Sequence, residues 1–217
     1  MSATQIFDYV LIATVAGGLC LGVARAMWMH FSGVRVVVVD WQRTAGQMLG
    51  DSIMVIALLA YCYLTLAYAW PLPRGWTPSW GAAVLLDWTA AKVAGAALLC
   101  AGTVIYAAAL WGMGASWRIG IDRKTPGGLV TTGIFAVSRN PIYLALDAMT
   151  VGTFLIQGRL IFAVLALVIV SLIHETILRE ERFLTAQYGD AFADYRSRVG
   201  RYWSWPAAGL SGIGSNQ

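Results

Sequence analysis

The sequence predicts an all-α membrane protein of about five transmembrane helices, with a short C-terminal helical hairpin and a cytoplasmic amphipathic helix. Two observations predict this class. Of the 217 residues, 59% are hydrophobic and only 12% are charged, and the mean hydropathy is +0.66. A globular domain carries about twice that charged fraction, so an ordinary soluble enzyme, a coiled coil and a disordered chain are excluded. The second observation is a series of long apolar stretches.

Five apolar stretches predict helices, at residues 6–29, 50–70, 93–112, 142–157 and 160–173. The first three reach the roughly 20 residues that a helix needs to span a bilayer, and glycines such as Gly95 and Gly102 permit close helix packing. Only Gly158 and Arg159 separate the last two stretches, which predicts a tight antiparallel hairpin. No helix breaker follows residue 173, so we expect the second arm to continue as helix beyond the membrane.

Positively charged residues predict how the chain crosses the membrane. They gather in the loops at 30–49 and 113–141 and in the tail after residue 178, whereas the intervening loops carry few. Because cytoplasmic loops are enriched in Lys and Arg, we expect the N-terminus outside and the C-terminus in the cytoplasm. These residues are spread as topology signals and form no basic patch, so a nucleic-acid partner is not expected.

Polar motifs become frequent only after Gly114. This divides the chain into a transmembrane scaffold of three helices, residues 1–112, and a region that carries the chemistry, residues 113–217. The three cysteines lie in apolar stretches and the two histidines are far apart in the sequence, so no metal is expected.

Two polar segments in the second region each have two interpretations. Residues 128–143 could be a turn followed by a helix that Asn140 caps, and residues 178–199 could be a solvated amphipathic helix. Alternatively, the hairpin brings Arg139 and the adjacent Glu180 and Glu181 into one polar cleft at the membrane surface.

Four motifs occur in an order and spacing that resemble a known family: GASWRIGID at 114–122, GGLVTTGIF at 127–135, SRNPIY at 138–143, and the glutamate pair with the tyrosines after it. They are similar to the integral-membrane methyltransferases of the isoprenylcysteine carboxyl methyltransferase and phospholipid methyltransferase group. The resemblance covers residues 112–203. It implies methyl transfer from S-adenosyl-L-methionine to an amine or carboxyl group of a lipid or other hydrophobic small molecule. It also implies that the protein lies in the plasma membrane of a prokaryote, in contact with membrane lipids, and acts at the cytoplasmic face.

The resemblance also implies which residues form the site. The cofactor-binding candidates are Gly127, Gly128, Leu129, Val130, Phe135, Asn140, Pro141, Ile142, Tyr143 and Glu180. Arg139 and Glu181 are the candidate catalytic residues. If the acceptor must lose a proton, the candidates for the base are Glu181, His174 and Asp147, in that order.

The sequence departs from the family pattern at three positions. Phe135 replaces the more usual Tyr, and Asn140 stands where the prenylcysteine enzymes have His. Thr176 stands where those enzymes have an Arg that helps to hold the substrate, which argues against a prenylcysteine carboxylate as the acceptor. Two other functions stay open: a small membrane transporter or scaffold without catalysis, and a methyltransferase that acts on a small thiol. Neither the oligomeric state nor the nucleophilic atom follows from the sequence.

Overall fold

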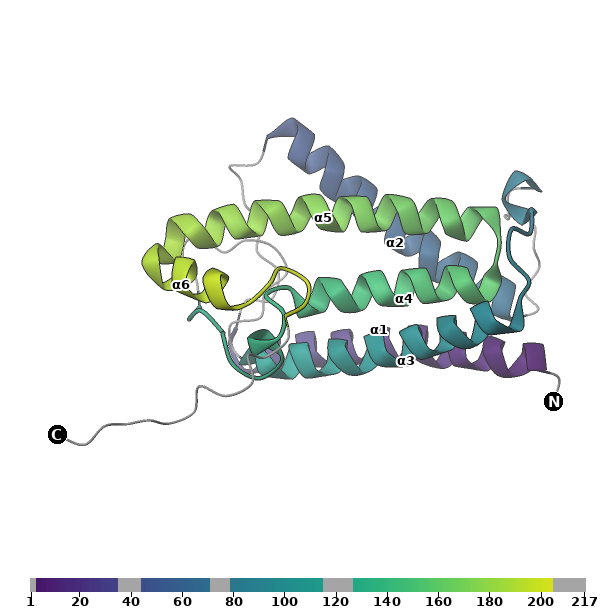
Figure 1. Cartoon of the computed structure of the whole chain (residues 1–217), viewed down its shortest axis with the longest axis horizontal. Helices are drawn as coiled ribbons and strands as arrows, with labels where there is room; N and C mark the ends of the chain where they lie inside the picture. The colour runs from purple at the N-terminus through teal and green to yellow at the C-terminus, as the bar shows by residue number, and fades with distance from the viewer. Residues whose placement is uncertain (1–2, 35–43, 71–78, 115–126, 205–217) are drawn as a thin grey trace.

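The computed structural model describes residues 3–34, 44–70, 79–114 and 127–204. Its long helices form a bundle (Figure 1): α1 (Ala3–Phe31), α2 (Ala45–Ala69), α3 (Thr89–Gly112), α4 (Pro141–Gln157) and α5 (Leu160–Tyr188). Helices α1, α2, α3 and α5 are long and apolar enough to cross a membrane, and α4 is a shorter apolar helix of 17 residues. The prediction of an all-α membrane protein is therefore confirmed, with four possible spans and a shorter fifth helix.

The turn between α4 and α5 is as tight as the sequence predicts. Gly158 ends α4 in the left-handed region, at φ 60°, and its carbonyl accepts hydrogen bonds from the backbone N–H groups of Leu85 and Leu86. An added Cβ at Gly158 would lie 1.8 Å from the Leu86 carbonyl oxygen. The segment that contacts the turn begins with a short 3₁₀ helix, η1 (Ser79–Ala82), and continues to an isolated bridge between Val84 and Arg159. Neither feature follows from the apolar pattern of the sequence.

Helices α3 and α4 approach each other closely because glycines line their contact. A Cβ on Gly95 would lie 2.6 Å from the Gly152 carbonyl oxygen, and a Cβ on Gly102 would lie 2.9 Å from that of Ala145. Small residues at such positions let two helix backbones pack at short range. The packing role predicted for Gly95 and Gly102 is confirmed, and it ties α4 firmly to the first three helices.

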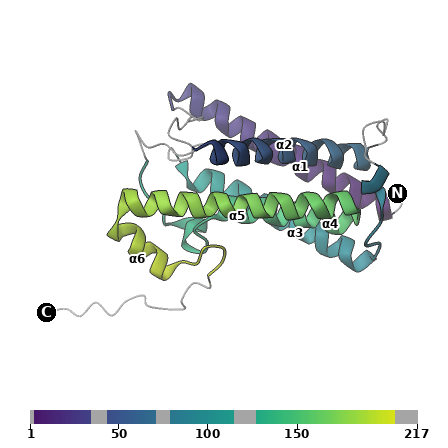
Figure 2. The same cartoon turned by 90° about the horizontal axis from the view of Figure 1, so that it is seen from above.

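Helix α5 continues well beyond the apolar run that predicted it, as the absence of a breaker indicated. It ends at Tyr188, and Gly189, at φ 50°, turns the chain into α6 (Asp190–Arg198). Of the two interpretations of residues 178–199, a single solvated helix does not form: residues up to Tyr188 are the end of α5, and Asp190–Arg198 form the short C-terminal helix α6. Figure 2 shows α6 folded back beside the end of α5, at the end of the bundle where α4 begins.

We predict that Gly158→Ala strongly destabilises the protein. The new Cβ meets the Leu86 carbonyl and the backbone keeps a conformation that costs an L-residue about 1–2 kcal/mol, so with the steric clash the expected loss is at least about 3 kcal/mol. The midpoint of thermal unfolding in detergent measures this. Gly33→Ala is the matched control, because Gly33 also follows the end of a helix with a positive φ (77°) but an added Cβ there has no neighbour within 4 Å. Equal effects of the two substitutions would contradict the account of the turn.

Candidate active site

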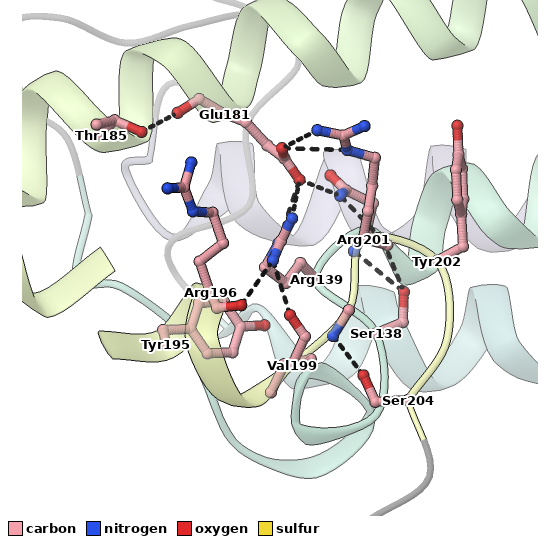
Figure 3. Close-up of polar contacts among 12 residues, drawn as sticks. Ser138, Arg139, Glu181, Thr185, Tyr195, Arg196, Val199, Arg201, Tyr202 and Ser204 are labelled. Atoms are coloured by element: carbon pink, nitrogen blue, oxygen red, sulfur yellow. Dashed lines mark hydrogen bonds and ion pairs between the residues drawn. The ribbon is translucent and has the colours of Figure 1, made fainter. Parts of the chain in front are cut away.

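Three segments that are distant in the sequence meet at the end of the bundle where α4 begins. The chain before α4 contains a short 3₁₀ helix, η3 (Gly133–Ala136), and it pairs with the segment that follows α6. The Arg139 N–H donates to the Gly200 carbonyl over 3.1 Å, and the Ser204 N–H donates to the Val137 carbonyl over 2.8 Å. These bonds bring residues 199–204 alongside the end of α5 (Figure 3).

The carboxylate of Glu181, on α5, lies between two arginines. One oxygen accepts hydrogen bonds from Nε and Nη2 of Arg139, over 3.2 and 2.8 Å, and the other accepts from Nε and Nη2 of Arg201, over 3.1 and 2.8 Å. The side chains of Glu181 and Arg139 are each 8% exposed and that of Arg201 is 35% exposed. A carboxylate this deeply buried requires such pairing, because an unpaired buried charge is very costly. The bonds to Glu181 raise the pKa of Arg201.

Arg139 uses its remaining donors on the backbone of α6. Its Nη1 donates to the carbonyls of Arg196 and Val199, over 3.1 and 2.7 Å. Both oxygens belong to the C-terminal end of α6, where helix carbonyls otherwise lack partners and carry a partial negative charge. Arg139 therefore links the start of α4, the end of α5 and the end of α6.

Asn140 precedes α4, and its side chain makes no capping hydrogen bond. Its Nδ2 instead donates to Glu181 Oε1 over 3.3 Å and to the Arg201 carbonyl over 3.1 Å. The interpretation of Asn140 as a helix cap is therefore wrong, because Glu181 takes the side chain. Pro141 follows as the first residue of α4, where its missing N–H costs nothing.

A second carboxylate, Glu180, has a different environment. The Tyr143 hydroxyl donates to Glu180 Oε1 over 2.6 Å, and the adjacent Arg179 pairs with Asp51 of α2 over 2.9 Å. Among the described residues, the second oxygen of Glu180 accepts no hydrogen bond. The two neighbouring glutamates thus have different surroundings. Both carboxylate oxygens of Glu181 accept hydrogen bonds from arginines, whereas one carboxylate oxygen of Glu180 accepts none from the described residues.

The structure brings together Arg139, Asn140, Tyr143, Glu180 and Glu181, but it turns other predicted residues away. The ring of Phe135 is buried, and a Cβ added to Gly112 of α3 would lie 3.4 Å from it. Ile142 packs with the Met29–Leu110 cluster between α1 and α3. The aromatic face expected of Phe135 is therefore used in packing and does not face the carboxylates.

Residues 127–130, which are predicted to bind the cofactor, are held at two points by α6 and the end of α5. Leu129 packs against the apolar cluster formed by Phe192, Tyr195 and Val199, and the Tyr188 hydroxyl donates to the Gly127 carbonyl. The neighbouring Gly128 is exposed. The WRIG motif at 117–120 lies outside the described residues.

Sequence reasoning missed Arg201 and Tyr202 as site residues. Arg201 was read only as one of several topology charges, and no local signal distinguishes it from Arg196 or Arg198. Tyr202 pairs with His174: Tyr202 Oη lies 2.5 Å from His174 Nδ1. A cavity of about 170 Å³, lined by residues that include Asp8, Asp87 and Lys92, lies at the opposite end of the bundle and contains none of the predicted site residues.

Comparison with known proteins supports the resemblance over less than half of the chain. Residues 90–191 match the family model described as phospholipid methyltransferase, so the resemblance seen in the motifs is confirmed for this region. A protein-S-isoprenylcysteine O-methyltransferase of Schizosaccharomyces pombe is 30% identical to the chain over 104 residues, which are 46% of this chain and 44% of the relative. The match thus spans less than half the length of that curated relative.

The family match coincides with the helices that form the candidate site. It contains all of α4 and α5, and nearly all of α3, against which α4 packs. Arg139, Tyr143, Glu180 and Glu181 lie inside it. Arg201 and Tyr202 lie beyond its end, in the segment that contacts Glu181.

We predict that Arg139→Ala destabilises the protein by about 3–5 kcal/mol, because it leaves the buried Glu181 with one cation. Arg201→Ala should cost less, since Arg201 is partly exposed and solvent replaces part of its interaction. Arg198→Ala is the control. Its pair with Asp194 is exposed, and such pairs contribute about 0–1 kcal/mol. Chemical denaturation in detergent measures all three. Equal losses for Arg139 and Arg198 would contradict the role assigned to Glu181.

Proposed function

We propose that this protein transfers a methyl group from S-adenosyl-L-methionine to a lipid or other hydrophobic acceptor at the cytoplasmic face of a membrane. The observation that carries the proposal is the Tyr143–Glu180 pair, which lies within the region that matches the phospholipid methyltransferases. Residues 113–217 carry the chemistry in this proposal, and residues 1–112 are the transmembrane scaffold.

The residues present suit this cofactor. S-adenosyl-L-methionine supplies a methyl group on a sulfonium, and an in-line displacement of that kind depends mainly on placement. Glu180 has an open carboxylate oxygen that suits the ammonium of the cofactor, a charge-assisted hydrogen bond. Tyr143 holds the other Glu180 oxygen and thereby orients the carboxylate. The backbone around the exposed Gly128 is a further candidate for contact with the cofactor, together with Gly127, Leu129 and Val130.

Arg139, Asn140 and Glu181 are positioning residues in this proposal. The side chain of Arg139 makes four hydrogen bonds within the protein, so binding of the cofactor carboxylate by Arg139 would break contacts that hold α6. Both oxygens of Glu181 are similarly engaged. Pro141 and Ile142 contribute by fixing the start of α4. This revises the catalytic role expected for Arg139 and Glu181, because neither has a free group to offer to the reaction.

The orientation of the chain fits an acceptor that arrives from the bilayer. The candidate site lies at the end of the bundle where the arginine-rich segments gather, and this end is cytoplasmic if positive residues mark that side. A hydrophobic acceptor would enter laterally between helices, and the polar cofactor would enter from water. Thr176 binds the Leu172 carbonyl and accepts a hydrogen bond from Arg179, so a prenylcysteine carboxylate is not the acceptor that we propose.

We predict that the full-length protein in detergent binds S-adenosyl-L-methionine and that Glu180→Gln weakens this binding. A hydrogen bond to a charged group contributes about 1.5–3 kcal/mol, so the dissociation constant should rise about ten- to a hundredfold. Titration calorimetry measures it. Glu175→Gln, on the exposed side of the same helix, is the matched control and should bind as the wild type does. A folded wild type that binds no S-adenosyl-L-methionine would overturn the proposed function.

A further inference from the structure

A second group of polar residues lies deeper between α4 and α5. Asn140 on α4 contacts Glu181 on α5. Seven residues further into each of these antiparallel helices, which is two helical turns, the sequence has Asp147 on α4 and His174 on α5. Asp147 lies about 9 Å along the helix axis from Pro141, at a rise of 1.5 Å per residue. The two helices therefore present a second polar pair beneath the Asn140–Glu181 contact.

Asp147 has an oxygen without a partner. Its Oδ1 is inaccessible to solvent and makes no hydrogen bond within the part of the chain that the structure describes. A carboxylate oxygen buried in this way is costly unless a donor reaches it, and ionisable residues inside membrane helices commonly serve function. A ligand that carries an N–H group or a positive charge would satisfy it.

Tyr202 connects this deeper level to the cytoplasmic end. Its hydroxyl lies 2.5 Å from His174 Nδ1, and the two rings are stacked with their centroids 6.2 Å apart. Tyr202 packs against the core between α4 and α5, and the adjacent Arg201 holds it in place through Glu181 (Figure 3). Burial, and next the nearby carboxylate of Asp147, raise the pKa of Tyr202. Tyr202 and His174 thus form a stacked, hydrogen-bonded pair that joins α5 to the C-terminal segment at the helical depth of Asp147.

Glu181, which the sequence ranks first as a base, is poorly suited to that task. Proton transfer to either of its oxygens would weaken the bonds to Arg139 or Arg201 and leave a buried guanidinium without its counter-charge. Asp147 has no such partner to lose. We propose that Asp147 is the group that takes the proton from a protonated amine acceptor, and that the His174–Tyr202 pair passes this proton toward the C-terminal segment. This inference rests on the proposed function.

The step balances with the methyl donor already named. An ammonium, R–NH₃⁺, enters between α4 and α5 and gives one proton to the Asp147 carboxylate. The freed nitrogen lone pair attacks the methyl carbon, and the N–C bond forms as the C–S bond breaks, with its electron pair staying on sulfur. The products are a methylated ammonium and a neutral thioether. The proton on Asp147 leaves through the His174 imidazole and then the Tyr202 hydroxyl, which lies in the C-terminal segment.

The cluster also indicates the class of acceptor. A carboxylate acceptor would need no base and would be repelled by Asp147, whereas an ammonium is attracted to it and requires deprotonation before it can attack.

Two long-chain probes distinguish proton removal from other roles of Asp147. Dodecylamine is protonated at neutral pH, whereas the nitrogen of 4-dodecylaniline is not, so only the first needs a base. Transfer of radiolabelled methyl from S-adenosyl-L-methionine to each probe is measured with the full-length protein in detergent. General-base catalysis contributes about 100-fold or more. Asp147→Asn should therefore lower the rate with dodecylamine by about that factor and leave the rate with 4-dodecylaniline unchanged.

Two further variants complete the experiment. Tyr202→Phe keeps the ring and removes the hydroxyl, so it should also slow transfer to dodecylamine selectively. Asp8→Asn, a half-buried carboxylate on α1 at the opposite end of the bundle, is the matched control and should change neither rate.

The outcomes separate this inference from the proposed function. Equal losses with both probes would make Asp147 a structural residue and overturn the inference, and so would an unchanged rate with dodecylamine. A wild type that binds S-adenosyl-L-methionine but methylates neither probe would also overturn the inference while leaving the proposed function standing. A folded wild type that does not bind S-adenosyl-L-methionine would overturn both.

Discussion

The burial of one carboxylate, Glu181, is the constraint on which the candidate site depends. A carboxylate excluded from water must be matched by cations and hydrogen-bond donors, and here these come from both sides of the chain. Arg139 and Asn140 approach from the start of α4, and Arg201 approaches from the segment after α6. The partners belong to two stretches of backbone and Glu181 to a third, so satisfying this one charge draws the three stretches together. The site is assembled by electrostatic pairing at the end of a bundle that is otherwise held by apolar contacts and close glycine packing.

Saturating Glu181 allows the neighbouring polar groups to remain available. Glu180 has one oxygen bound by Tyr143 and one open, and Asp147 has a buried oxygen without a donor. All of these groups lie along the contact between α4 and α5, at increasing depth from the cytoplasmic end in the proposed orientation. The account therefore gives each level one task. In the proposed function, Arg139 and Arg201 hold the backbone, Glu180 binds the polar cofactor, and Asp147 meets an acceptor that comes from the membrane.

The sequence was sufficient for the helices and for one side of the site. Long apolar runs and a two-residue break at Gly158 predict the bundle and its hairpin, because hydrophobic length and turn chemistry are local properties. The meeting of Arg139 with the glutamates follows from that hairpin. Arg201 could not be predicted, since its contact with Glu181 depends on how Gly189 turns the chain back, and its charge alone resembles that of its neighbours. The packing of the Phe135 ring against α3 is a tertiary contact that no local pattern reveals, and its predicted contact with the cofactor stays a prediction.

A structure of the protein bound to S-adenosyl-L-homocysteine would test most directly whether Arg139 and Arg201 position the backbone while Glu180 binds the cofactor. The account predicts that the ammonium of the ligand contacts Glu180, that the ligand lies toward residues 127–130, and that Arg139 and Arg201 remain paired with Glu181. A ligand whose carboxylate is held by Arg139, with the ion pair to Glu181 broken, would contradict it. A ligand found at the opposite end of the bundle, beside Asp8 and Lys92, would contradict it as well.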